Sequence, residues 1–165
     1  GLAPAAHGGT RTGRVFTGDK SSDFLYKCLF NAKISNQNTS VHINDGLKLK
    51  NAFITPALKC VPPEDKPLKI ELDNCSKFFN NELNILKNLK VVVALGKIAF
   101  DTCKIFYSEK FEISKHVQFG HGKTYKLKNG VNLVGCYHPS PRNVNTGRIN
   151  EKMMTQLFQK VKRLD

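Results

Sequence analysis

No stretch of the 165-residue sequence approaches the roughly 20 consecutive apolar residues that are needed to cross a bilayer. The longest apolar run, from Val91 to Leu95, has the length of a buried strand. The first residues, Gly1 to Pro4, also lack a basic region followed by an apolar core, so no secretory signal is visible. We therefore expect a cytoplasmic protein that does not act on membranes.

Acidic residues are scarce, with 13 Asp and Glu against 26 Lys and Arg, which gives a formal net charge of +13. A polyanion is the first partner to consider, because Lys and Arg gain affinity by releasing phosphate counterions. A solvated, lysine-rich surface explains the same excess. The 40% hydrophobic content with 24% charged residues is typical of a folded globular chain, and the length fits a single domain.

Several common enzyme signatures are missing. The glycine-rich segment Gly1–Asp19 is not followed by Gly-Lys-Ser/Thr, and its glycines fail the spacing of a dinucleotide fingerprint. No Gly-x-Ser-x-Gly motif occurs. The sequence therefore excludes a Walker-type nucleotide loop, a dinucleotide-binding loop and a nucleophile-elbow hydrolase.

A Cys-x-x-Cys pair is also absent, although the chain holds five cysteines. Cys28, Cys103 and Cys136 sit within apolar patterns, which favours buried and inert thiols. Cys60 precedes a proline-rich segment, and Cys75 begins one face of the following predicted helix. Two thiolates do not complete a zinc or iron–sulfur site, so their spacing alone is a weak indication of metal.

The spacing of apolar residues predicts four helices: one after Ser21 or Ser22, one over 69–89, one after Gly96 and one at the chain's end. Either Ser21 or Ser22 can cap the first of them. In the helix over 69–89 we expect the apolar positions to be buried, namely Ile70, Leu72, Cys75, Phe78, Phe79, Leu83, Leu86 and Leu89. Strands are predicted at 52–55 and 91–95, and a hairpin over 125–134 turns at Asn129-Gly130.

This alternation predicts an α/β fold, a sandwich around a mostly parallel sheet. The ligand crevice of such a sheet lies beyond the carboxyl ends of its strands. We expect three loops to meet there: Gly1–Asp19, Thr55–Lys66 and His138–Arg148.

Two side chains in these loops suit chemistry, and each has a purely structural alternative. Asp19, at a turn into a helix, is either a capping carboxylate or a catalytic base. His138, beside Pro139 at a strand end, is either simply packed or donates a hydrogen bond to a carbonyl or an anion. Ser140 to Asn143 form a stiff loop with one cation, Arg142, a shape suited to entering a duplex.

Six motifs occur in a fixed order along the chain: Gly1–Gly8, Arg11–Asp19, Ile54–Pro63, Val93–Gly96, Tyr137–Ser140 and Asn145–Arg148. Together they resemble the uracil-DNA glycosylase superfamily, and most closely its family 5, the type-b enzymes. Family 4 carries an acidic residue after the first glycine, where this sequence has Leu2.

The resemblance implies a three-layer α/β/α sandwich in a single domain, and a monomeric monofunctional enzyme of DNA base excision repair. Such an enzyme flips uracil, and possibly hypoxanthine or xanthine, out of DNA and hydrolyses the N-glycosidic bond to leave an abasic site. The resemblance also interprets the net positive charge as a DNA-facing footprint, meaning a surface of cationic side chains that contacts DNA. Four of these side chains are expected near the crevice: Arg11, Arg14, Arg142 and Arg148.

The resemblance also implies roles for individual residues. Phe16 matches the aromatic on which the flipped base stacks, and His138 the histidine that supports the O2 atom of the base. Asp19 matches the carboxylate that acts on the attacking water. Asn143 matches a polar residue of the loop that enters the duplex. The remaining residues that we expect to bind the substrate are Gly1, Ala3 and Arg142.

By the same resemblance, Cys60 and Cys75 match the third and fourth ligands of a 4Fe–4S cluster. The family's first two ligands come from a Cys-x-x-Cys segment before its first strand, which this sequence lacks. Either the chain is a fragment without its N-terminal segment and first strand, or the cluster is lost. We expect the first, an N-terminally truncated domain, because a core strand is missing together with the two ligands.

Two further positions depart from the family pattern. Pro56 stands where relatives often place an Asn that recognises the base edge. Asp65, a candidate catalytic residue, replaces an Asn, and if it shares a small pocket with Asp19, one of the two pKa values should rise.

Two alternatives stay open at this point. One is a catalytically silent relative that binds lesions or DNA, and the other is an iron–sulfur protein with a structural or electron-transfer role.

Overall fold

The computed structural model describes residues 1–164, apart from the side chain of Asp65. Its helices are α1 (Lys20–Asn31), α2 (Lys69–Ile85), α3 (Lys97–Ser108), α4 (Pro141–Asn145) and α5 (Glu151–Val161). Its strands are β1 (Val91–Leu95), β2 (Thr124–Lys126) and β3 (Asn132–Cys136). None of the helices within 1–164 combines the length and the apolar character that a membrane crossing requires.

The three strands form one mixed sheet in the order β1-β3-β2. β1 and β3 are parallel, with Val91 opposite Asn132 and Leu95 opposite Cys136. β2 is antiparallel to β3, and the turn between them closes with a hydrogen bond of 2.9 Å from the Gly130 amide to the Leu127 carbonyl. The predicted hairpin with its turn at Asn129-Gly130 is therefore confirmed.

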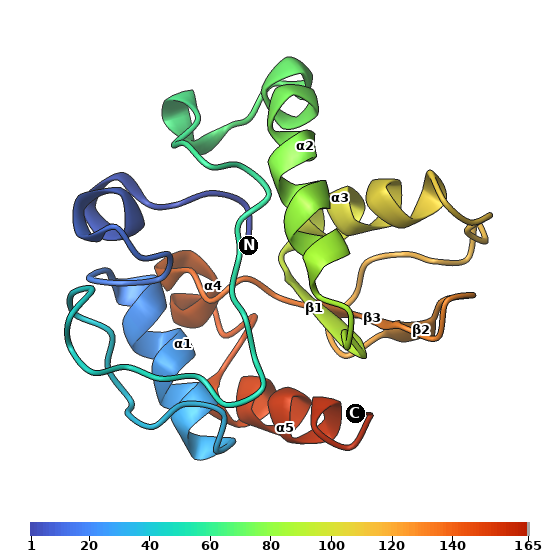
Figure 1. Ribbon diagram of the computed structural model, residues 1–165. Coiled ribbons are helices and arrows are strands. Elements are labelled where there is room, and N and C mark those ends of the chain that lie inside the picture. Colours follow the sequence, from blue (N-terminus) through green and yellow to red (C-terminus); the bar gives the residue numbers. More distant parts are fainter. Residues whose placement is uncertain (165) are drawn as a thin grey trace.

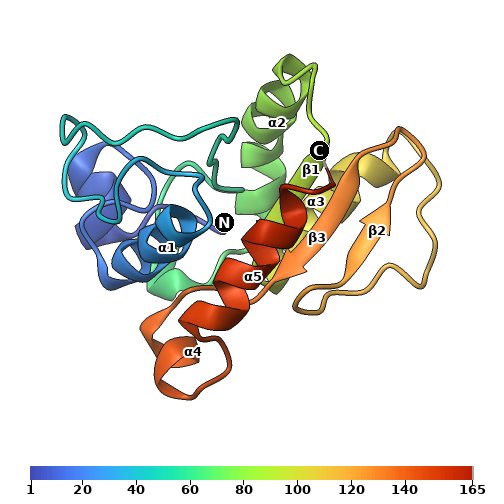
Figure 2. The ribbon, with the colours of Figure 1, turned by 90° about the horizontal axis from the view of Figure 1, so that it is seen from below.

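Successive side chains along β1 and β3 point to opposite faces of the sheet, so each face packs against its own layer of helices. Leu95, Val134 and Cys136 pack into one core with α1 and α5, whereas Ala94 and Leu133 pack into a second core with α2 and α3. Figure 1 shows α2 and α3 on one side of the strands and α5 on the other, and Figure 2 shows α5 running alongside β3. The three-layer α/β/α sandwich is therefore confirmed, with one parallel and one antiparallel pair of strands.

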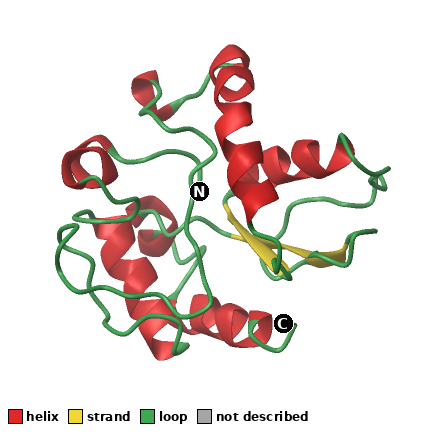
Figure 3. Cartoon of the chain, in the orientation of Figure 1, coloured by secondary structure: helices red, strands yellow, loops and turns green. Residues whose placement is uncertain are grey.

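The strand predicted at 52–55 was wrong, because this segment is an irregular connection (Figure 3). A strand needs a neighbour to receive its backbone hydrogen bonds. The end of this segment instead meets the first residues of the chain: the Gly1 amino group donates to the Thr55 carbonyl at 3.1 Å, and the amides of Ala57 and Leu58 donate to the carbonyls of Gly1 and Leu2 at 2.9 and 2.8 Å.

Helix α2 is shorter and less buried than its apolar pattern predicted. It ends at Ile85, and it buries Phe79 and Leu83, which lie four residues apart on one stripe. Phe79 meets Phe106 of α3 edge-on, with ring centroids 6.2 Å apart. Only this stripe meets the core, so Ile70 and Phe78 are 59% and 49% exposed, and their predicted burial was wrong.

Side-chain caps mark the starts of two helices. Asp19 caps α1, one of its two predicted roles, because its side chain accepts the amide of Ser22, the third residue of the helix; the alternative caps Ser21 and Ser22 lie inside the helix. The short helix α4 was not predicted. Ser140 caps it and Pro141 occupies its first turn, where a missing amide proton costs no hydrogen bond.

Candidate active site

The site lies where the parallel strands β1 and β3 end. Gly96 follows β1, and Tyr137 and His138 follow β3, so the two ends meet at one edge of the sheet. The Gly96 amide donates to the Cys136 carbonyl at 2.8 Å. Gly96 lies against His138, because the Cβ atom of any other residue at position 96 would stand 3.5 Å from the Cβ of His138. The strand ends therefore fix where the imidazole stands.

Phe16 brings the first loop onto this edge. Its ring is 7% exposed, and its centroid lies 5.8 Å from that of His138 with the planes tilted by 35°. A Cβ on Gly1 would stand 3.1 Å from the Cε2 atom of Phe16, and Gly1 is itself paired with Ala57. The predicted meeting of the three loops is thus confirmed for these residues, and Ala3 lies half-buried in the same segment.

His138 is a neutral imidazole at neutral pH. Burial is the main cause that lowers its pKa from 6.5 to about 4, because a charged ring would lose its hydration. The side-chain amide of Asn143 donates to the backbone carbonyl of His138 at 2.9 Å. Asn143, expected to enter a DNA duplex, therefore tethers the His138 backbone in this structure.

Asp19 has the first of its two predicted roles, that of a capping carboxylate, and its role as a catalytic base stays a prediction. Its Oδ1 atom accepts the Ser22 amide at 2.8 Å, so it caps α1. Its Oδ2 atom faces the single π-helical turn Ala6–Thr10, where a Cβ on Gly8 would stand 2.0 Å from that oxygen. Only glycine at position 8 lets the carboxylate come this close to the backbone.

The four arginines of the predicted DNA-facing footprint are placed differently from one another. Arg11 is exposed and donates from Nε to the His7 carbonyl at 2.9 Å. Arg142 is exposed on α4. Arg148 is exposed as well, and its guanidinium lies over the ring of Tyr137, 4.7 Å from the centroid.

Arg14 turns inward, so its expected place in that footprint was wrong. Its Nη2 atom forms a 2.7 Å ion pair with Asp45. The guanidinium also binds Thr17 and Ser40. These partners could not be predicted from the sequence, because no local pattern pairs Arg14 with an acid 31 residues away.

The five cysteines are all free thiols, and they fall into two groups. Burial raises the pKa of Cys28 and Cys103 to about 11 and that of Cys136 to about 12, which keeps these thiols protonated and inert. Cys60 is exposed and Cys75 is half-buried. The predicted division is confirmed, and the chemistry of these two thiols fits half of a four-thiolate site.

No group of three or more metal-binding side chains gathers within the described part of the chain. The side chain of Asp65, the remaining candidate catalytic group, lies outside the described residues. Pro56 has no side-chain donor to offer a base, and its carbonyl accepts a hydrogen bond from Lys59 Nζ at 3.1 Å.

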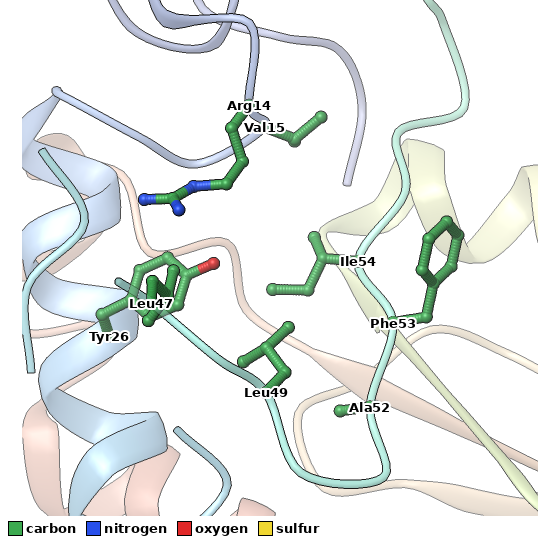
Figure 4. Close-up of a pocket in the computed structure, with 8 residues that line it drawn as sticks. All are labelled: Arg14, Val15, Tyr26, Leu47, Leu49, Ala52, Phe53 and Ile54. Carbon is green, nitrogen blue, oxygen red and sulfur yellow. The ribbon is translucent and has the colours of Figure 1, made fainter. Parts of the chain in front are cut away.

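Two hollows border the site loops. The first, of about 310 Å³, lies beneath Arg14 and Val15, with Tyr26 of α1 on one side and Ile54 on the other (Figure 4). The second, of about 580 Å³, is lined by residues of the first and second loops, among them Pro4, Thr10, Pro56 and Cys60, together with Glu82 of α2.

Comparison with known proteins gives a consistent result over the whole chain. The family model described as the uracil DNA glycosylase superfamily matches residues 1–162. A Type-5 uracil-DNA glycosylase of Pyrobaculum aerophilum is 41% identical over 160 residues, covering 97% of this chain and 68% of the relative. One of Thermus thermophilus is 40% identical over 164 residues, covering 99% of this chain and 73% of the relative.

A Type-5 uracil-DNA glycosylase of Mycobacterium bovis is 40% identical over 165 residues. That match covers 99% of this chain and 61% of the relative, so the chain spans less than two thirds of the mycobacterial protein.

Proposed function

This chain belongs to family 5 of the uracil DNA glycosylase superfamily, and on that premise we propose that it removes uracil from DNA. The reaction hydrolyses the N-glycosidic bond and leaves an abasic site. The observation that carries the proposal is the buried Phe16 ring beside the neutral His138 at the carboxyl edge of the sheet.

The Phe16 ring supplies an apolar face for the flipped base. Stacking on an aromatic ring favours any planar base, so this contact holds the base without selecting it. Pro56 adds no side-chain hydrogen bond at the base edge. We therefore extend the proposal to other deaminated bases, hypoxanthine and xanthine, which a site without that contact would reject less strongly.

His138 stabilises the leaving group. When the bond between C1′ and the base breaks, the base takes the electron pair and becomes an anion with charge on O2. A neutral imidazole donates its N–H to that oxygen without bringing a buried cation into the ground state. Asn143 holds the backbone carbonyl of His138 and so restricts the position of the ring.

Asp19 acts on the attacking water. The water oxygen forms the new bond to C1′, and the proton it loses passes to the Asp19 carboxylate. The same carboxylate is fixed by the Ser22 amide, so it is held in place before substrate binds. Asp65 is a second candidate for handling this proton.

The partner that fits this site is DNA. The exposed Arg142 and Arg148 border the His138 loop, and the chain carries a net charge of +13. Cationic side chains beside a base-flipping site neutralise backbone phosphates. We propose that the enzyme acts as a monomer in the cytoplasm, with Asn143 close to the lesion.

Cys60 and Cys75 belong to the proposal as two thiolate ligands of a 4Fe–4S cluster. Their exposure distinguishes them from the three buried thiols. A bound cluster would tie the segment before Pro62 to helix α2 as a structural link. The test is iron and sulfide content, with visible absorbance, in the natural protein and its Cys60→Ser, Cys75→Ser and Cys103→Ala forms. We expect loss in the first two only, and equal iron in all four would contradict the assignment.

The activity is tested with a duplex oligonucleotide that holds one uracil, treated with alkali after incubation. We expect strand cleavage at the uracil, and slower cleavage of matched hypoxanthine and xanthine substrates. Tight binding without cleavage would favour a catalytically silent lesion-binding relative. Weak binding that ignores the lesion, together with bound iron, would favour an iron–sulfur protein of structural or electron-transfer role.

A further inference from the structure

A partly buried polar network joins the first loop to the connection between α1 and residue 50. At its centre the Arg14 Nη2 atom donates to Asp45 Oδ2 at 2.7 Å and to Ser40 Oγ at 2.9 Å, while Arg14 Nε donates to Thr17 Oγ1 at 2.9 Å. The hydroxyl oxygens of Thr17 and Ser40 lie 2.7 Å apart, so one of the two hydroxyls donates a hydrogen bond to the other. Figure 4 shows the Arg14 side chain extending from its loop toward Tyr26 of α1.

The network has a buried end at Thr17 and Ser40 and a partly buried end at Arg14, whose side chain is 22% exposed. Thr17 and Ser40 are 0% exposed, and the side chain of Asp45 is 8% exposed. The Asp45 carboxylate also accepts the amides of Val41 and Leu47, at 2.8 and 3.0 Å. The hydrogen bond and charge of Arg14 hold the Asp45 pKa well below its usual range. A partly buried network of this kind rigidifies the segments that it joins.

One of those segments is the turn that presents Phe16. Phe16 has a φ of +52°, a left-handed conformation that costs a non-glycine residue energy and persists only where the surroundings hold it. The next residue, Thr17, is held through its side chain by Arg14 and Ser40. The residue after that, Gly18, donates its amide to the Ser40 carbonyl at 2.8 Å. The network thus holds the backbone on the carboxyl side of Phe16.

We propose that Arg14 and Asp45 are positioning residues, which hold the Phe16 ring against His138 in the orientation that a flipped base requires. This inference rests on the proposed glycosylase activity. Neither side chain is hydrogen-bonded to His138; Asp45 holds Arg14, and Arg14 holds the turn through the Thr17 hydroxyl. A one-ångström displacement of a residue that orients the substrate costs up to about a hundred-fold in rate.

The first test is Asp45→Asn, which keeps the shape of the side chain and removes the charge that Arg14 binds. We expect single-turnover excision of uracil to slow roughly ten-fold, while the Kd for the same duplex changes less than about two-fold, because the DNA-facing arginines are untouched. The matched control is Glu151→Gln, which breaks the exposed ion pair with Lys27 at 2.7 Å. It should leave both quantities unchanged.

The second test separates positioning from general destabilisation. If Asp45 acts through the Phe16 ring, Asp45→Asn should slow excision less than about two-fold in a Phe16→Ala background, because coupled residues are not additive. A purely structural role predicts the same ten-fold loss in both backgrounds. That equal loss, or an Asp45→Asn variant that excises at the wild-type rate, would overturn the proposal.

Three further variants keep the inference testable if Asp45→Asn does not fold. Thr17→Val preserves volume but removes the hydroxyl that links Arg14 to the turn, and we expect excision to slow by about three-fold or more. Arg14→Lys keeps the charge without the planar fork, and should retain more activity than Arg14→Gln. Wild-type rates in Thr17→Val and Arg14→Gln would also contradict the proposal. A wild-type protein that excises no uracil would instead contradict the proposed function.

Discussion

At the scale of single residues, chemistry at the strand ends was predictable, and long-range pairing was not. His138 was expected at the crevice because it directly follows a buried strand, and it lies there with Phe16 beside it. Arg14 was expected to face DNA because it lies in a glycine-rich loop with a second arginine. Its ion pair with Asp45 spans 31 residues, and no local pattern in the sequence indicates such a contact.

Gly8 offers a sharp test at this scale. In Gly8→Ala the new methyl group would stand 2.0 Å from Asp19 Oδ2, so the carboxylate must move. We expect roughly ten-fold slower single-turnover excision and a loss of up to about 1 kcal/mol in unfolding free energy, because the cap of α1 is disturbed. Gly120→Ala is the control, since its methyl would meet the flexible end of Lys123. A Gly8→Ala protein as active as this control would contradict the geometry.

At the scale of elements, sequence patterns predicted the helices and the hairpin, whose hydrogen bonds join residues close together in the sequence. The hairpin at Asn129-Gly130 and the helix after Gly96 are both confirmed. The strand predicted at 52–55 was wrong because a strand depends on its neighbour. Helix α2 buries one stripe only, since the apolar pattern of a helix does not reveal how much of its surface meets another element.

The cap of α1 separates the structural and catalytic roles of Asp19. Asn caps a helix about as well as Asp, whereas Ala does not. We expect the unfolding free energy of Asp19→Asn to lie within a few tenths of a kcal/mol of the wild-type value. That of Asp19→Ala should be lower than wild type by about 1 kcal/mol. Both should excise uracil more slowly if the carboxylate accepts the proton of water. Wild-type excision by Asp19→Asn would reduce Asp19 to a capping residue.

At the scale of the whole molecule, the order of strands and helices predicted three layers, and the alternation of side chains along β1 and β3 explains them. The net charge of +13 indicated a polyanionic partner. Composition does not say which cations face that partner: Arg142 and Arg148 are exposed, and Arg14 is held inside. The cluster assigned to Cys60 and Cys75 stays a prediction.

The stability of the whole molecule should depend on pH through His138. The pKa of His138 is about 4 in the folded protein and about 6.5 in the unfolded chain. As the pH falls below 6.5, the imidazole is therefore protonated in the unfolded chain while it is still neutral in the folded protein, which favours unfolding. The contribution of the neutral ring is complete above pH 6.5 and is lost toward pH 4. From pH 7 to 4.5 we expect wild type to lose about 2 kcal/mol more than His138→Asn. Equal losses in denaturant titrations would contradict the burial of this ring.

The most direct measurement of the central claim is the single-turnover rate of uracil excision by His138→Ala from duplex DNA at saturating enzyme. Loss of the hydrogen bond to the departing base should slow excision more than about ten-fold, equivalent to about 1.4 kcal/mol or more of transition-state stabilisation. The affinity for the same duplex should stay close to that of wild type. Excision at the wild-type rate by this variant would contradict the account of the site.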